Sequence, residues 1–209
     1  MVLSATEVNK LKQAPAVEGV LPVILQRWSA RSYADRDVPL SELEKLFEAA
    51  RWAASARNEQ PWRFIVATRN SPEYNKMLDA MLDFTRPWAS TAPVLILCLA
   101  YTRFSPDGSP NPFHLYDLGA AATTIMLQAS AQGLASRTLA SFHSDALRKA
   151  FAIPADFAIG SVIALGYQGD PSALSDKQLV AMETTLRTRK PLNELVFSAW
   201  GEPAKFQCK

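Results

Sequence analysis

Two arginines and one serine alternate near the start of the chain, in the segment Arg27-Trp28-Ser29-Ala30-Arg31. In an extended backbone, the first, third and fifth side chains of this segment project from one side. Two guanidinium groups and a hydroxyl suit a phosphate dianion, because arginine donates paired hydrogen bonds to its oxygens. The same alternation is also common on solvated surfaces. The segment therefore indicates either a phosphate site or an exposed charged stretch.

A second basic cluster, Arg187-Thr188-Arg189-Lys190-Pro191, lies near the other end of the chain. Alone it is typical of a solvated charge run. Arginine supplies thirteen of the 22 basic residues, whereas glycine occurs only eight times and never in the spacings that bind phosphate through bare backbone. Any bound phosphate must therefore be held by side chains, and the two arginine clusters fit a single clamp.

A polar turn contains Ser55, Asn58 and Gln60 and ends in Pro61-Trp62. Each amide side chain carries both a donor and an acceptor, which suits the edge of a heteroaromatic ring. Residues of these types also form ordinary surface loops. The turn therefore has two interpretations, a ligand contact and a plain connection.

The composition has 48% apolar and 20% charged residues with a net charge of +2, which is typical of a globular protein. The basic residues are dispersed, so no nucleic-acid-binding surface is predicted. His114, His143, Cys98 and Cys208 lack the spacing of zinc ligands, so we expect no metal site. Both thiols are expected to be free.

The longest apolar run, residues 92–101, is shorter than the roughly 20 residues that a membrane helix requires. Charged residues among the first twelve positions interrupt any secretory signal. We therefore expect a cytoplasmic protein with no membrane partner.

Helical and strand patterns alternate along the chain. The helices and strands that they predict must position these side chains. A capping box from Ser41 to Glu44 predicts a helix start, and Gly133 predicts a helix stop. The apolar periodicity predicts helices over residues 41–54, 72–84, 114–132 and 144–151, and strands over residues 63–68, 93–100, 134–140 and 158–167. Helices mixed with strands of non-local pairing favour an α+β fold, and the length favours one domain over residues 1–209.

Taken together, the motifs resemble those of the FMN-dependent nitroreductase family. The resemblance runs from Arg27 to Phe197. The matching stretches are Arg27-x-Ser29-x-Arg31-Ser32-Tyr33, residues 50–64, Ala92-Pro93-Val94-Leu95, residues 117–121, Gly133-Leu134, residues 163–167 and Arg189-Lys190-Pro191-Leu192.

The resemblance implies a nitroreductase-like α+β fold, with a central mixed sheet flanked by helices, in an intertwined homodimer. Two FMN sites would each be lined by both subunits. Residues 1–20 would form an N-terminal extension, and residues 195–209 an arm that packs on the partner, in line with the apolar bulk of residues 195–200 and 206.

The resemblance also implies a role for individual residues. The flavin phosphate and ribityl oxygens would be bound by Arg27, Trp28, Ser29, Arg31, Arg187 and Arg189. The polar turn would approach the flavin from the partner subunit and contribute Ser55 and Asn58. A third segment would pass flavin N5, mostly through its backbone, and contains Thr138, Leu139, Ala140 and Ser141. No catalytic side chain is assigned.

The implied activity is the reduction of nitroaromatic, quinone or related electron-poor compounds with NADH or NADPH, by ping-pong hydride transfer through flavin N5. The expected partners are a second copy of the chain and a small aromatic or quinone-like substrate. Two alternatives keep the FMN site. One changes the reaction, to reductive dehalogenation, flavin fragmentation, or enone or amine oxidation. The other is a flavin-binding module without turnover.

Overall fold

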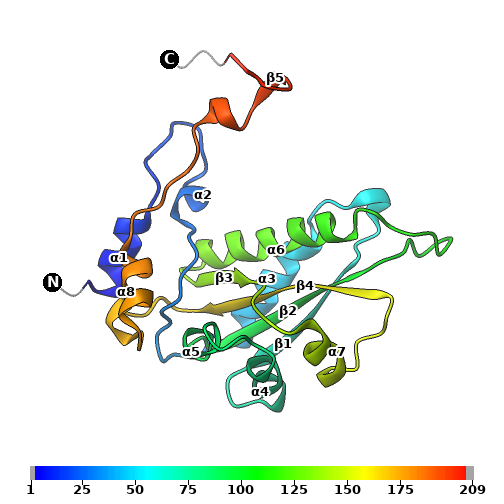
Figure 1. The fold of residues 1–209 in the computed structure, drawn as a ribbon, viewed down its shortest axis with the longest axis horizontal. Helices are drawn as coiled ribbons and strands as arrows, with labels where there is room; N and C mark the ends of the chain where they lie inside the picture. Colours follow the sequence, from blue (N-terminus) through cyan, green and yellow to red (C-terminus); the bar gives the residue numbers. More distant parts are fainter. Residues whose placement is uncertain (1–2, 206–209) are drawn as a thin grey trace.

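The computed structural model describes residues 3–205 and contains a four-stranded sheet with helices on both faces (Figure 1). The strands are β1 (Trp62–Thr68), β2 (Val94–Tyr101), β3 (Ala135–Leu139) and β4 (Phe157–Gly166), in the order β1-β2-β4-β3. All three ladders are antiparallel, and an isolated parallel bridge between Ser29 and Ser136 adds the mixed pairing beside β3. The expected α+β fold is confirmed.

Helices precede, connect and follow these strands. The α-helices are α1 (Ala5–Lys12), α2 (Pro22–Gln26), α3 (Leu40–Arg51), α4 (Pro72–Asp79), α5 (Arg86–Ala89), α6 (His114–Ala131), α7 (Ser144–Ala150) and α8 (Lys177–Thr184). Short 3₁₀ turns span Ala56–Asn58, Pro171–Ala173 and Leu192–Glu194, and a small hairpin pairs β5 (Phe197–Ala199) with β6 (Glu202–Pro203).

Strand β2 is buried on both faces because its side chains alternate between two apolar cores. Leu95 and Leu97 pack with α4, α5 and α7, whereas Ile96 and Cys98 pack with α3 and α6. Burial raises the pKa of Cys98 to about 12, so this free thiol stays protonated at neutral pH. Packing on both of its faces therefore holds the sheet in place.

Most predicted elements form, but three helix boundaries were wrong. Helix α3 ends at Arg51 and does not reach residue 54. The capping box is absent, because α3 begins at Leu40 and the carbonyl of Pro39 accepts from the amides of Glu42 (3.0 Å) and Leu43 (3.2 Å). Ser41 therefore lies inside the first turn. Helix α4 ends at Asp79 because the chain turns to pair Met81 with Phe142. The predicted stop of α6 is confirmed by Gly133, whose φ is +73°.

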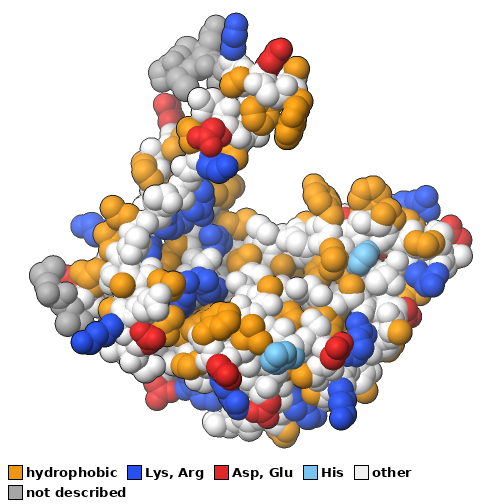
Figure 2. All heavy atoms as spheres, viewed as in Figure 1, with side chains coloured by type: hydrophobic (Ala, Val, Ile, Leu, Met, Phe, Trp, Pro, Cys, Tyr) orange, Lys and Arg blue, Asp and Glu red, His pale blue; other side chains and the backbone are white. Residues whose placement is uncertain are grey.

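The chain after α8 runs beside the segment that precedes Arg27 and then projects away from the sheet as an arm, residues 185–205 (Figure 1). Its large apolar side chains are exposed, and Trp200 is 95% exposed. Apolar atoms gather at its tip, and a hollow separates it from the sheet (Figure 2). Residues 206–209, which include Cys208 and the end of the expected arm, lie outside the described residues.

Among residues 3–205, every helix is too short or too polar to cross a bilayer.

Gly169 allows a close backbone approach that the site needs. A Cβ at this position would lie 2.6 Å from the carbonyl carbon of Tyr33 and 2.7 Å from its oxygen, so the backbone after the arginine motif would have to move. We expect Gly169→Ala to lower the free energy of unfolding by about 1–3 kcal/mol.

Urea denaturation measures the effect, with Gly119→Ala as the control. Gly119 lies in α6, and a Cβ added there would meet no atom within 4 Å, so this change should alter stability by no more than about 1 kcal/mol. Equal stability of the Gly169→Ala and wild-type chains would contradict the close approach.

Candidate functional site

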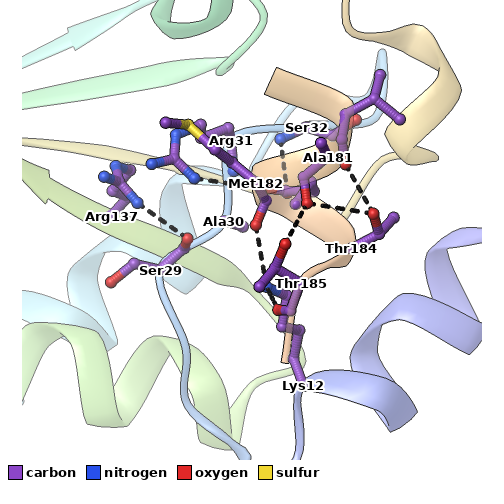
Figure 3. A network of polar contacts seen from close by, with 12 residues as sticks. Lys12, Ser29, Ala30, Arg31, Ser32, Arg137, Ala181, Met182, Thr184 and Thr185 are labelled. Atoms are coloured by element: carbon purple, nitrogen blue, oxygen red, sulfur yellow. Dashed lines mark hydrogen bonds and ion pairs between the residues drawn. The ribbon is translucent and has the colours of Figure 1, made fainter. Parts of the chain in front are cut away.

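The arginine motif lies beside β3 and belongs to no helix. Ser29 bridges to Ser136, and its carbonyl accepts a hydrogen bond from the guanidinium of Arg137 at 3.1 Å (Figure 3). The indole of Trp28 donates to the Oδ1 of Asn9 on α1 at 2.8 Å. Strand β3 and the N-terminal helix therefore position the motif together.

The two basic clusters of the sequence meet in one pocket of about 180 Å³. Arg187 donates to the carbonyls of Arg27 (2.7 Å) and Leu25 (2.6 Å), which joins chain segments some 160 residues apart. The pocket is lined by Lys12, Arg27, Trp28, Ser29, Arg31, Met182, Arg187 and Arg189. No carboxylate is among these lining residues.

Like charges face one another in this basic pocket. Burial and the nearby Arg189 lower the pKa of Arg27, and burial, Arg189 and Arg27 lower the pKa of Arg187. Within residues 3–205, none of these three guanidinium groups forms an ion pair with a carboxylate. Repulsion of this kind is relieved when an anion binds.

The arginines have different roles. Arg187 uses its guanidinium to brace backbone carbonyls, so it supports the wall of the pocket. Among the described residues, Arg189 donates only to its neighbour Thr188, at 2.7 Å, and the side chain of Arg27 makes no hydrogen bond. Arg27 and Arg189 are therefore the groups best able to bind a ligand.

A larger pocket of about 620 Å³ adjoins the basic pocket and shares Arg31 and Met182 with it. Its wall includes Trp88, over whose ring the guanidinium of Arg137 lies at 5.4 Å from the centroid. The predicted residues Thr138, Leu139, Ala140 and Ser141 all line it. The two pockets therefore adjoin at Arg31 and Met182, the smaller one cationic and the wider one lined by both polar and apolar residues.

Ser55 and Asn58 line neither of these pockets. They belong to the turn after α3, where Arg57, Asn58 and Gln60 have φ values of 54°, 55° and 50°. The Oγ of Ser55 accepts from the amide of Gln60 at 3.1 Å. Non-glycine residues in the left-handed region are strained, and such strain clusters at functional sites.

Two neighbouring elements hold this strained turn. Asp117 on α6 accepts from the amide of Ala56 at 3.1 Å, and Glu59 accepts from the amide of Ser105 at 3.1 Å. The guanidinium of Arg57 lies 4.3 Å from the ring centroid of Phe104. The loop of residues 102–112 is thereby tied to the turn.

Sequence reasoning missed three charged residues at the site: Lys12, Arg137 and Glu183. The ammonium of Lys12 donates to the carbonyls of Met182 (3.1 Å) and Thr185, and burial lowers its pKa (Figure 3). Glu183 is fully buried. Each is a single charged residue in an ordinary amphipathic pattern, so only the three-dimensional arrangement distinguishes it.

A family model described as the nitroreductase family matches residues 24–87 and 71–167. An Archaeoglobus fulgidus relative, provisionally named NADH dehydrogenase/NAD(P)H nitroreductase, is 33% identical over 160 residues, covering 74% of this chain and 88% of its own. A 4-nitrobenzoate reductase from Nocardioides sp. (strain LMS-CY) is 27% identical, covering 90% and 93%.

Solved structures agree with these matches. The crystal structure of an oxidoreductase containing FMN has a TM-score of 0.83 and 28% identity, covering 92% of this chain and 97% of its own. A provisionally named nitroreductase from Desulfovibrio desulfuricans, in complex with FMN, has a TM-score of 0.70 and 26% identity, covering 88% and 98%. The chain belongs to the nitroreductase family.

Proposed function

We propose that this chain binds FMN in the joined pockets and is an NAD(P)H-dependent oxidoreductase that reduces nitroaromatic, quinone or related electron-poor compounds. The observation that carries the proposal is the basic pocket, whose guanidinium groups have no acidic partner among its lining residues and which shares Arg31 with a wider pocket. Two structural relatives that contain FMN, and a relative named 4-nitrobenzoate reductase, support it.

The residues present suit each end of the cofactor. Arg27, Ser29 and Arg189 offer donors for a phosphate in a pocket of about 180 Å³. The adjoining pocket of about 620 Å³ has room for a flat ring system beside residues 138–141. Arg137 lines the wider pocket, and its buried Nε has no hydrogen-bond partner among the described residues.

When bound, FMN supplies hydride transfer between a nicotinamide and a second acceptor. In this proposal the chain's tasks are to hold the phosphate, present backbone amides of residues 138–141 to the ring, and leave one ring face open. None of these tasks requires a side-chain nucleophile.

The purified protein should carry a flavin spectrum. We expect absorbance at about 450 nm and its loss on anaerobic titration with NADH or NADPH, because the donor reduces the cofactor. A panel of nitroaromatic, quinone, halogenated and enone acceptors then identifies the oxidising substrate. Absence of the absorbance after reconstitution with FMN would refute the proposal, and reduction without turnover of any acceptor would favour a binding module.

Removing the two guanidinium groups that are free to bind should weaken FMN binding. We expect the double variant Arg27→Ala/Arg189→Ala to raise the FMN dissociation constant by at least about 100-fold, since charge-assisted hydrogen bonds contribute about 1.5–3 kcal/mol each. Fluorescence titration measures the constant.

The control for this variant is Arg36→Ala/Arg103→Ala, which removes two exposed guanidinium groups that line neither pocket. It should bind FMN as the wild-type chain does. Unchanged affinity in the first double variant would mean that the basic pocket does not hold the phosphate.

We further propose that two copies assemble, with residues 195–209 of each copy packed on its partner and Ser55 and Asn58 completing the partner's site. Two features support this arrangement: the exposed apolar side chains of residues 195–200 and the strained turn of residues 55–60, neither of which lines a pocket of the site in its own chain. In this proposal residues 1–209 form one domain with an N-terminal extension at residues 1–20.

Sedimentation should give twice the chain mass of 23.0 kDa. We expect Phe197→Ser/Trp200→Ser to shift the protein towards monomer and to lower FMN occupancy. The two aromatic side chains are exposed in the single chain, and the variant removes the apolar area that they would bury against the partner. Val66→Ala, on β1, is the control. A wild-type monomer at micromolar concentration that still binds FMN would contradict the shared site.

A further inference from the structure

Glu183 on α8 contacts the arginine motif from a position far away in the sequence. Its side chain is fully buried, and its Oε1 accepts from the amides of Arg31 (2.8 Å) and Ser32 (3.0 Å). The Nε2 of Gln168 is a third donor, at 3.4 Å. One carboxylate oxygen therefore holds two consecutive amides at the end of the motif.

The second carboxylate oxygen has a different environment. The Oε2 of Glu183 lies 3.9 Å from a terminal nitrogen of Arg31 and accepts no hydrogen bond from the described residues. The two groups therefore attract each other without a close two-pronged contact, which would have occupied the guanidinium. Arg31 is restrained in direction and keeps donors for a ligand.

Glu183 is also the acid that faces a group of cations. Its carboxylate forms an ion pair with Arg31 and interacts electrostatically with Lys12 and Arg137. Burial lowers the pKa of Lys12 and of Arg137, and the negative charge of Glu183 counteracts this lowering. A buried cation is costly unless an opposite charge lies near it. The carboxylate thus permits three cations to gather beside the two pockets.

We propose that Glu183 is a positioning residue of the anion site, which holds the motif backbone at Arg31 and Ser32 and directs the Arg31 guanidinium to the junction of the two pockets. The inference rests on the proposed function, in which the ligand is FMN. Glu183 does not touch the ligand and acts through Arg31. Neither the family match nor the motif spacing identifies this role.

The direction in which the affinity for an anion changes when Glu183 is neutralised distinguishes a positioning role from a purely electrostatic one. A negative charge close to an anion site weakens anion binding by Coulomb repulsion, so neutralising it should strengthen binding if nothing moves. If Glu183 positions Arg31, neutralising it should instead weaken binding. Glu183→Gln suits this test because the amide oxygen can still accept from the two backbone amides, whereas Glu183→Ala would leave them unsatisfied in the interior.

We expect Glu183→Gln to raise the FMN dissociation constant by about 10-fold, measured by fluorescence titration, with circular dichroism like that of the wild-type chain. The matched control is Glu44→Gln, the same chemical change at an exposed position of α3 that contacts neither pocket. Unchanged or tighter binding by a folded Glu183→Gln protein would overturn the proposal.

A double-mutant cycle separates positioning from a general loosening of α8. In an Arg31→Met background, Glu183→Gln should change the FMN dissociation constant by less than about 2-fold, because its effect passes through the missing guanidinium. An equal 10-fold effect in both backgrounds would show that Glu183 only supports the fold, and would also overturn the proposal.

The same variants distinguish failure of this inference from failure of the proposed function. If the wild-type chain binds no FMN, the proposed function fails. Thermal stabilisation by inorganic phosphate then tests the inference in its place: it should be smaller in Glu183→Gln than in the wild-type and Glu44→Gln proteins. Equal stabilisation of all three proteins would refute the role of Glu183.

Discussion

Hydrogen bonds to the backbone of residues 27–32 determine where the arginine side chains lie, because this segment belongs to no helix or named strand. Strand β3 contributes the bridge from Ser136 and the donor of Arg137, helix α8 contributes Glu183, and the chain after α8 contributes Arg187. These contacts come from three regions of the sequence. The cationic pocket can therefore exist only after β3, α8 and the start of the arm have packed together, which couples its formation to completion of the fold.

The charge distribution of the site opposes folding when no anion is present. Arg27, Arg187 and Arg189 repel one another, and burial disfavours the charged form of Arg27 and Arg187. A ligand that binds only the folded chain stabilises it by mass action, and here it would also remove this repulsion. The folded state remains stable despite this repulsion because the apolar cores on the two faces of β2 do not include the pocket arginines.

The sequence predicted the strands of the sheet well, because strands follow from local patterns of apolar residues. The meeting of the two arginine clusters, some 160 residues apart, was inferred instead from their common fit to one phosphate. Strand β2 is a continuous apolar run, and the α6 stop is a glycine in the left-handed region. The start of α3 was wrong because Pro39 supplies the first carbonyl, which a capping pattern does not reveal. Glu183 was missed since its partners lie about 150 residues away, and a lone acid in a short helix carries no signal of burial.

The scarcity of glycine has a consequence at the turn after α3. Three left-handed positions there are occupied by Arg57, Asn58 and Gln60, each of which costs conformational free energy that glycine would avoid. In return, each of these positions carries a polar side chain, while Asp117 ties the turn to α6 and Glu59 ties it to the loop of residues 102–112. Contacts within its own chain therefore set the conformation of the turn, whether or not a second surface meets it.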